Sequence, residues 1–268
     1  MKRLIVAFFL LLLFALPLGA ITKLPVSVMK RRERLPVIHS AKDEPYYPAV
    51  SIEARSGTGF FREHQVYEFL PEMVWPHMML DRHGRVHIVT TLNVEAGELQ
   101  LIGYFFSEDG LSYSDILVVD TTLAVSPTVA TSPVSDKVAI VYTRPRDMLS
   151  VYNSDVWYIE SADGTSWELS DRVNLTEYTS ADTLRAYCDL DAIYDNEDRL
   201  HIVFNAIYFD ETTGITSGSG ANIYHWSEET GFSLVANGWF DTYPGVWNRT
   251  VSKMNIGEDP ETGYLYCT

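Results

Sequence analysis

The sequence predicts an all-β fold, and three observations support that prediction. Runs of 5 to 8 β-branched and aromatic residues alternate with clusters of Gly, Asp, Asn and Pro, as strands alternate with turns. No stretch shows a sustained 3.6-residue apolar period of helical length. One hairpin turn recurs at intervals of 54 and 66 residues, which is the spacing of four-stranded blades. We therefore expect a β-propeller of four-stranded antiparallel blades.

The repeated turn has the pattern Ser-x-Asp-Gly. It occurs at 107–110 and 161–164 and, with Glu in place of Asp, at 227–231. Glycine adopts positive φ without steric cost, and the preceding aspartate can bond the turn's own backbone. A tyrosine lies three residues before each serine, and an aromatic residue that follows each glycine is expected to pack on the neighbouring blade. The sequence therefore predicts a structural rather than catalytic role for Ser107, Asp109, Gly110, Ser161, Asp163, Gly164 and Trp167.

The segments around the turns align into blades. The inner strands are expected at 77–80, 128–131, 189–194 and 253–256, and the second strands at 85–89, 137–141, 199–203 and 263–266. The third strands are expected at 99–106, 155–160 and 222–226, each followed by an outer strand such as 116–119. This makes three complete blades and part of a fourth, and residues 50–69 are expected to add an outer strand before the first. Four units could close alone, but we expect a fragment of a larger propeller, because an open array leaves a strand edge unpaired.

The first residues of the chain differ from the rest. Lys2 and Arg3 precede the apolar run 4–16, and a small residue stands at Ala20, which is the pattern of a secretory signal peptide. An uncleaved membrane anchor is the alternative. The expected organisation is a signal peptide at 1–20, a linker or pro-segment at 21–48 and a partial β-propeller at 49–268. This order predicts a secreted, periplasmic or cell-surface protein with no stable membrane insertion after cleavage.

Composition narrows the range of partners. The chain has 36 acidic and 20 basic side chains and a net charge of −16, which argues against nucleic acid as a partner. Cys188 and Cys267 are expected to stay separate thiols, because they fall on different blades. No zinc spacing and no phosphate-binding loop occurs in the sequence. We expect no cofactor; a structural calcium at the acids of 189–198 is the weaker alternative to an acidic turn.

Candidate ligand-binding residues fall where inner strands begin and second strands end, at the mouth of the central channel. Arginine holds carboxylates bidentately, and aromatic faces stack on sugar rings. The candidates are Trp75, Arg144, Arg185, Asp189, Trp247 and Arg249. Glu95 with Asp147 or Asp189 could form a carboxylate pair, although solvated loop acids are the simpler interpretation.

The turns at 107–113 and 161–167 resemble the Asp-box of the sialidase-like, or BNR-repeat, β-propellers. The box is usually written Ser-x-Asp-x-Gly-x-x-Trp, and both copies here lack the residue between Asp and Gly. The resemblance covers about residues 75–268 and implies boxes on the outside of a propeller, away from the active site. In enzymes of that family it would also imply an arginine triad, a tyrosine nucleophile paired with a glutamate, and an aspartate acid. The triad has no residue-by-residue counterpart in this chain.

Three functions stay open at this point. The expected one is a secreted propeller that binds glycans or proteins. The alternatives are an exported glycoside hydrolase of sialidase-like fold, of the exo-sialidase type, and a structural module of a longer surface protein. His87 and His201 occupy equivalent second-strand positions, which favours a repeated packing role over catalysis.

Overall fold

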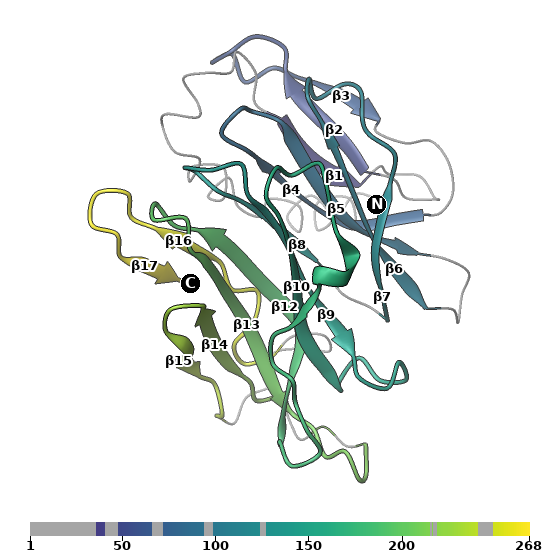
Figure 1. The fold of residues 1–268 in the computed structure, drawn as a ribbon, viewed down its shortest axis with the longest axis vertical. Coiled ribbons are helices and arrows are strands. Elements are labelled where there is room, and N and C mark those ends of the chain that lie inside the picture. Colours follow the sequence, from purple (N-terminus) through teal and green to yellow (C-terminus); the bar gives the residue numbers. More distant parts are fainter. Residues whose placement is uncertain are drawn as a thin grey trace, which may run out of the picture.

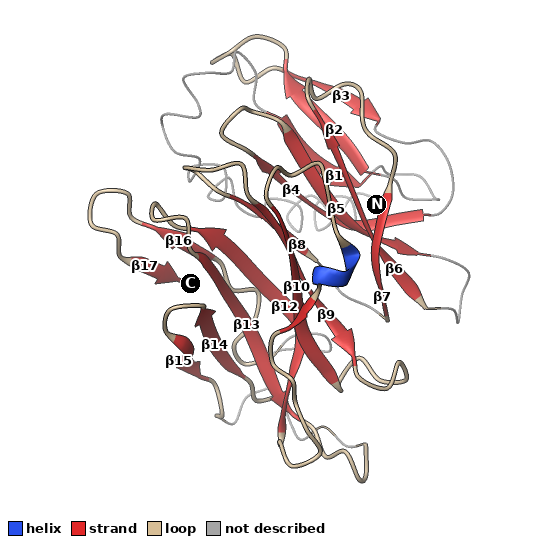
Figure 2. Ribbon diagram, in the orientation of Figure 1, coloured by secondary structure: helices blue, strands red, loops and turns tan. Residues whose placement is uncertain are grey.

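The computed structural model describes residues 36–40, 48–65, 72–93, 99–123, 127–214, 216, 219–240 and 249–268. Within these residues the chain forms strands and one 3₁₀ helix, η2 (Leu169–Asp171), as Figure 2 shows. The predicted signal peptide, most of the predicted linker, Glu95 and Trp247 lie outside the described residues. The architecture is that of an antiparallel β-propeller, as expected.

Blade 1 is a four-stranded antiparallel sheet of consecutive strands (Figure 1). Its strands are β4 (Glu72–Leu80), β5 (Val86–Asn93), β6 (Gln100–Ser107) and β7 (Leu117–Thr122). All four were predicted in this order, and the observed inner strand β4 is longer than predicted because it continues past a bulge at Trp75 and Pro76.

Blades 2 and 3 repeat this order. Blade 2 consists of β8 (Thr128–Thr131), β9 (Val138–Pro145), β10 (Ser154–Ser161) and β11 (Val173–Asn174). Blade 3 consists of β12 (Leu184–Tyr194), β13 (Leu200–Tyr208), β14 (Asn222–Ser227) and β15 (Gly231–Asn237). One backbone pairing, Ser154 with Ala186, joins the two blades into a single eight-stranded sheet.

Two smaller sheets flank the blades. The N-terminal sheet pairs β1 (Pro36–Ser40), β2 (Pro48–Glu53) and β3 (Phe61–Gln65), and the half-blade pairs β16 (Ile256–Glu258) with β17 (Leu265–Cys267). The N-terminal sheet differs from the single outer strand predicted there. Part of the predicted linker is β1, which forms a strand because its backbone pairs with β2. Sequence periodicity does not reveal that non-local pairing.

Apolar clusters between successive sheets hold the array together. Val50 and Ile52 of the N-terminal sheet pack on Phe105 and other residues of blade 1. Similar clusters lie between blades 1 and 2, between blades 2 and 3, and between blade 3 and the half-blade. The inner strands β4, β8, β12 and β16 contact one another in that order, as expected for strands around a central channel.

The repeated turn is closed by its own side chains. The Ser107 Oγ accepts a hydrogen bond from the Gly110 N–H at 2.8 Å, and the Asp109 carboxylate accepts from Leu111 and Ser112 N–H at 2.7 and 2.8 Å. The turn at 161–166 makes the same set of bonds. Backbone N–H groups lower the pKa of the Asp109 and Asp163 carboxyls, because these groups bond the ionised form. The glycines at 110, 164 and 231 all have positive φ.

The aromatic residues after the turns behave differently from one another. Trp167 of blade 2 packs edge-on against Tyr104 of blade 1, with ring centroids 4.9 Å apart, so it reaches the neighbouring blade as predicted. Tyr113 instead contacts Phe105 of its own blade, and Phe232 contacts Phe204 of its own blade.

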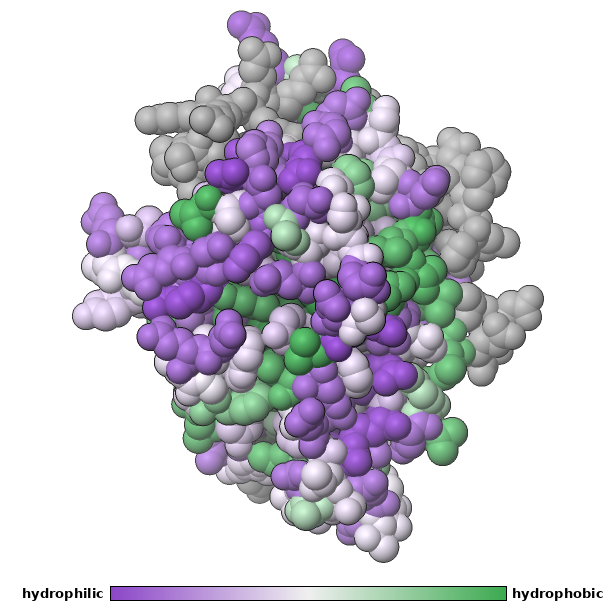
Figure 3. Space-filling view, in the orientation of Figure 1, coloured by the Kyte–Doolittle hydropathy of each residue, from purple (hydrophilic) through white to green (hydrophobic). Residues whose placement is uncertain are grey.

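Outside the core, the face drawn in Figure 3 is largely hydrophilic and its hydrophobic residues form separate patches. Cys188 and Cys267 are both free thiols, in agreement with the prediction. Among the described residues, no helix has the length and apolar character needed to cross a membrane.

Candidate functional site at the inner strands

The bulges within β4 and β12 and the segment that precedes β16 carry an unusual set of residues. Trp75, Asp189 and Lys253 each lie six residues before the aspartate that opens the turn to the second strand, at Asp81, Asp195 and Asp259 respectively. The pairing of β4 with β5 and that of β12 with β13 both shift register here. A bulge changes the direction in which side chains project and is common beside binding sites. These three equivalent positions therefore define the candidate site.

Trp75 is the most exposed of the predicted ligand-binding residues that the structure describes. Its backbone has φ +52°, a conformation that a bulky residue rarely adopts, and the residue is 51% exposed. Lys253 has a similar φ of +55°. Backbone strain of this kind concentrates at functional positions, where the surrounding structure holds it in place. The fold thus holds an exposed indole at a bulge of an inner strand.

Asp189 is partly buried and lies against a neighbouring strand. The Asn205 Nδ2 on β13 donates to the Asp189 Oδ2 at 3.1 Å, and Asn205 is itself fully buried. Burial raises the pKa of the Asp189 carboxyl, even though the Lys253 N–H, the Lys253 charge and Asn205 act in the opposite direction. A carboxyl with a raised pKa beside an amide and an ammonium group is a recognised functional pattern.

A pair of stacked tyrosines lies beside Asp189 in the chain. The Tyr152 and Tyr187 rings are 5.6 Å apart and nearly parallel, at 8°. The Arg249 guanidinium covers them, at 4.8 Å from the Tyr187 ring and 5.8 Å from the Tyr152 ring. Cys188, between Tyr187 and Asp189, has a pKa raised to about 12 by burial and by the Asp189 charge, so this thiol is unreactive at neutral pH.

Arg144 lies farther out, in an open cleft of about 380 Å³ at the end of β9. The Arg144 guanidinium sits 5.1 Å from the Trp157 ring, and its Nε is 3.4 Å from the buried Asp120 carboxylate. Arg172 also contacts Asp120, at 3.2 Å. The cleft is lined by Arg144, Pro145, Arg146, Asp155, Trp157, Asn174, Glu177 and Tyr178.

Arg185 is fully buried and does not face a ligand. Its guanidinium donates to the Asn153 Oδ1 at 2.8 Å, to the carbonyls of Asp182, Leu184 and Thr179, and to Glu211. Buried charges need such partners, and here they fix the loop that leads into β12. The placement of Arg185 at an open channel mouth was therefore wrong; the residue braces a loop instead.

The structure brings together only part of the predicted set. Asp189 lies beside Lys253, and Arg249 lies over the tyrosine next to Asp189. Arg144 contacts Asp120 and Trp157, Arg185 contacts Asn153 and Glu211, and Arg249 lies over Tyr187 and Tyr152. Trp247 is outside the described residues. Lys253, Tyr152 and Trp157 were missed, and of these only Lys253 had a sequence signal, namely its fixed distance from Asp259.

The acids at 189–198 bond protein groups. Asp191 accepts from the Ile256 N–H of the half-blade at 2.9 Å, and Asp195 accepts from Arg199 and His201. Within the described part of the chain, no group of three or more His, Cys, Asp or Glu side chains is placed to hold a metal ion.

No protein-family model and no curated protein sequence matches this chain. Among solved structures, the chain is similar to the α-L-arabinanase of Penicillium chrysogenum complexed with arabinobiose. The TM-score is 0.61 at 13% identity, over 88% of this chain and 71% of that one. At this identity the likeness supports the fold alone.

Two further solved structures are similar at lower scores. One is an ulvan lyase of a polysaccharide lyase family, with a TM-score of 0.48 at 9% identity over 84% of this chain and 58% of that one. The other is an α-L-arabinofuranosidase of Fusarium graminearum in complex with an iminosugar inhibitor, with a TM-score of 0.46 at 11% identity, over 86% and 82%. The chain thus spans between about three fifths and four fifths of these proteins.

Proposed function

We propose that this protein binds carbohydrate at the bulges of its inner strands, with Trp75 of β4 as the stacking surface and Asp189 of β12 as the main polar contact. The observation that carries the proposal is Trp75: an indole that is 51% exposed, at a bulge, with a positive φ. Exposing a large aromatic group and straining the backbone both cost free energy, and a ligand that covers the ring would offset that cost.

The neighbouring groups suit sugar hydroxyls. The Asp189 carboxylate accepts hydrogen bonds, the Lys253 ammonium donates them, and the buried Asn205 fixes the carboxylate in place. An apolar face with a few oriented polar groups is the usual composition of a small-ligand site.

A neutral glycan is the ligand class that we favour. The net charge of −16 repels polyanions at low salt. An α-L-arabinanase that shares the fold is known with arabinobiose bound, so arabino-oligosaccharides are the first ligands to test.

The test is a binding titration of the whole chain with arabino-oligosaccharides and a panel of other neutral oligosaccharides. The Trp75→Ala variant should weaken binding at least fivefold, since stacking on an aromatic face contributes about 1–3 kcal/mol. Trp239→Ala is the matched control, because Trp239 is 41% exposed and lies on another part of the chain. Equal affinity of wild type and Trp75→Ala, or no binding to any glycan, contradicts the proposal.

A glycoside hydrolase is the second candidate, and the raised pKa of Asp189 is the observation that favours it. A carboxyl that stays protonated more readily than usual can donate a proton to a leaving group. Asp189→Asn should then abolish turnover and leave glycan binding within a few-fold of wild type. Loss of both together would instead assign Asp189 to binding alone.

We also propose export from the cytoplasm, since residues 1–20 have the pattern of a secretory signal peptide. N-terminal sequencing of the protein recovered from culture medium or periplasm tests it. Cleavage after Ala20 is expected, and an intact N-terminus in the membrane fraction would support the anchor instead.

A further inference from the structure

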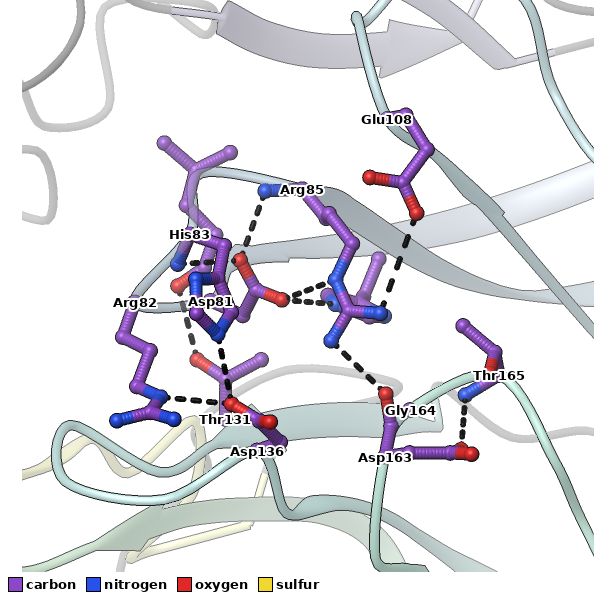
Figure 4. A network of polar contacts seen from close by, with 12 residues as sticks. Asp81, Arg82, His83, Arg85, Glu108, Thr131, Asp136, Asp163, Gly164 and Thr165 are labelled. Carbon is purple, nitrogen blue, oxygen red and sulfur yellow. Dashed lines mark hydrogen bonds and ion pairs between the residues drawn. The ribbon is translucent and has the colours of Figure 1, made fainter.

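Blade 1 holds the turn of blade 2 through four residues, which we call the blade-1 latch: Asp81, Arg85, His87 and Tyr104. Figure 4 shows its outer part, where Arg85 reaches across to the next blade. The Arg85 Nη2 donates to the Asp163 carbonyl at 2.8 Å, and the Tyr104 hydroxyl donates to the Gly164 carbonyl at 2.6 Å. Two successive carbonyls of a Ser-x-Asp-Gly turn are therefore the groups that the latch binds.

Inside the blade-1 latch, Asp81 orders the donors. Its carboxylate accepts from the Arg85 Nε and lies 3.3 Å from the His87 Nε2, while the His87 Nδ1 lies 2.6 Å from the Tyr104 hydroxyl. Burial of Asp81 opposes ionisation, but the bonds from His87 and Arg85 keep its pKa well below the usual range. The carboxylate stays charged and holds both partners in position.

Blade 3 contains the same arrangement, the blade-3 latch: Asp195, Arg199, His201 and His225. The Asp195 carboxylate accepts from the Arg199 Nε at 2.6 Å and lies 3.0 Å from the His201 Nε2. The His201 Nδ1 lies 2.9 Å from the His225 Nε2. In both blades the spacing in the sequence is Asp-x-x-x-Arg-x-His.

His225 occupies the position of Tyr104. Tyr104 pairs with Val89 across β5 and β6, and His225 pairs with Val203 across β13 and β14, where Val89 and Val203 each lie two residues after the latch histidine. A histidine can donate or accept through its second ring nitrogen, as the tyrosine hydroxyl does. The second ring nitrogen of His225, Nδ1, lies 3.4 Å from the Ser233 Oγ on β15, whereas the Tyr104 hydroxyl bonds the docked turn. The Asp-Arg-His part of the blade-1 latch is thus repeated in blade 3, and its fourth position is partnered within the blade.

The two latches differ in what covers them. The Arg85 side chain is 13% exposed under the blade-2 turn, whereas that of Arg199 is 40% exposed. Arg199 contacts Glu197 and Glu229 of its own blade through Nη1 and Asp195 through Nη2, whereas the Arg85 Nη2 bonds the docked turn. Among the described residues, no Ser-x-Asp-Gly turn bonds the blade-3 latch. The half-blade reaches only the adjacent turn, where the Asn196 N–H donates to Glu258.

We propose that the blade-3 latch is a docking site for a β-hairpin of a partner protein that carries a Ser-x-Asp-Gly turn. The sequence contains only three turns of this kind. The turn at 161–164 is held by blade 1, and the turn at 107–110 packs on the N-terminal sheet, 3.2 Å from Ile52 at the Gly110 Cβ position. The third turn belongs to blade 3 itself, so none of these three turns covers the site in the described part of the chain.

The blade-1 latch also requires glycine at position 164 of the turn that it binds. A Cβ added at Gly164 would lie 2.8 Å from the His87 Cε1 and 2.6 Å from the Val138 Cγ2, so the turn fits over the histidine only without a side chain. The same constraint applies over His201. A partner turn with a larger residue in place of glycine should not bind.

A fluorescent peptide with the sequence of residues 157–172, cyclised to hold its hairpin, is the probe. It contains the turn that blade 1 recognises. We expect saturable binding to the whole chain in anisotropy titrations and at least a fivefold loss with Arg199→Gln. A peptide with Gly164→Val should lose binding to the same extent. Lys137→Gln is the matched control, because Lys137 is the blade-2 counterpart of Arg199 and should leave binding unchanged.

If Arg199→Gln unfolds, as judged by thermal melting, His225→Phe provides a second variant. It keeps an aromatic ring but removes the ring nitrogens, and it should also weaken binding. Absence of saturable binding at millimolar peptide, or equal affinity for both peptides, overturns the proposal. Sedimentation of the protein alone tests whether a second copy of the chain occupies the site. A dimer that Arg199→Gln dissociates and that excludes the peptide would assign the surface to a second copy of the chain, which also overturns it.

Discussion

The contact between blades 1 and 2 and the contact between blade 3 and the half-blade have the same parts but differ in completeness. The contact between blades 1 and 2 consists of an apolar cluster, the blade-1 latch and the turn docked on that latch. The contact between blade 3 and the half-blade consists of a smaller apolar cluster that includes Val203, Ile223 and Ile256. The blade-3 latch at this contact has no docked turn.

This difference shows that latch and turn are separate components. The latch forms within one blade, from the aspartate of its own first turn. In blade 3 the Asp195, Arg199 and His201 contacts are present without a docked turn. The docked turn then adds two hydrogen bonds to backbone carbonyls and excludes water from the histidine. Equivalent substitutions at the two contacts should therefore change the stability of the protein by different amounts.

The largest expected difference concerns the turn glycines. Gly164→Ala should destabilise the protein by about 3 kcal/mol or more, since a positive φ costs about 1–2 kcal/mol and overpacking about 1–3 kcal/mol. Gly231→Ala has the same φ problem but nothing within 4 Å of the new Cβ, so about 1–2 kcal/mol is expected. Urea unfolding of both variants measures the contrast. Equal losses would mean that the docking contact contributes nothing.

The next contrast compares the residues that bond the docked turn. Tyr104→Phe leaves the buried His87 Nδ1 and the Gly164 carbonyl without a partner, which should cost about 1–3 kcal/mol. His225→Phe should cost less than about 1 kcal/mol, because its site is open to water that can replace the lost bond. The same unfolding assay measures both. A larger loss at His225 would show that the blade-3 latch is already occupied.

Much of the array could be predicted from sequence because its signals are local. A turn glycine, an aspartate before it and an alternating strand are all read within a few residues, so the order of strands β4 to β17 was predictable. Strand β1 was missed because it is defined by pairing with β2 across residues that carry no periodic pattern. The half-blade was located by Asp259 alone, which opens a turn like those of the other blades.

The candidate site was less predictable, because it depends on neighbours far apart in sequence. Asp189 and Trp75 could be selected by their distance from the turn aspartates. The burial of Arg185 could not, since Asn153 and Glu211 reach it from other loops. The Asp-x-x-x-Arg-x-His repeat was visible as equivalent histidines, and a packing role was predicted for them. Its use as a turn-binding latch emerges only when the neighbouring blade is in place.

A third prediction concerns the stability of the protein at low pH. Hydrogen bonds hold the pKa of Asp81 and of Asp195 below the ordinary range despite burial, so each carboxylate adds stability above the unfolded pKa near 4 that is lost as pH falls through it. At pH 3 the loss should be about 1 kcal/mol for Asp81. The stability gap between wild type and Asp81→Asn or Asp195→Asn should therefore narrow between pH 5 and pH 3. A gap that is independent of pH would contradict the shifted ionisation.

The smallest effect is expected where blade 3 meets the half-blade at the inner strands. Burial raises the pKa of Asp189, so its ionisation opposes folding, and this penalty appears as pH rises above the unfolded pKa. Asp189→Asn should be slightly more stable than wild type at pH 7 and indistinguishable from it at pH 3, which thermal melting at both pH values can measure. Asp191→Asn is the control, because Asp191 instead bonds the Ile256 N–H and its loss should weaken the contact with the half-blade. If Asp189→Asn is destabilised at pH 7, then Asp189 acts as a structural link to Lys253. The positive φ of Lys253 then supports this link and does not serve a ligand.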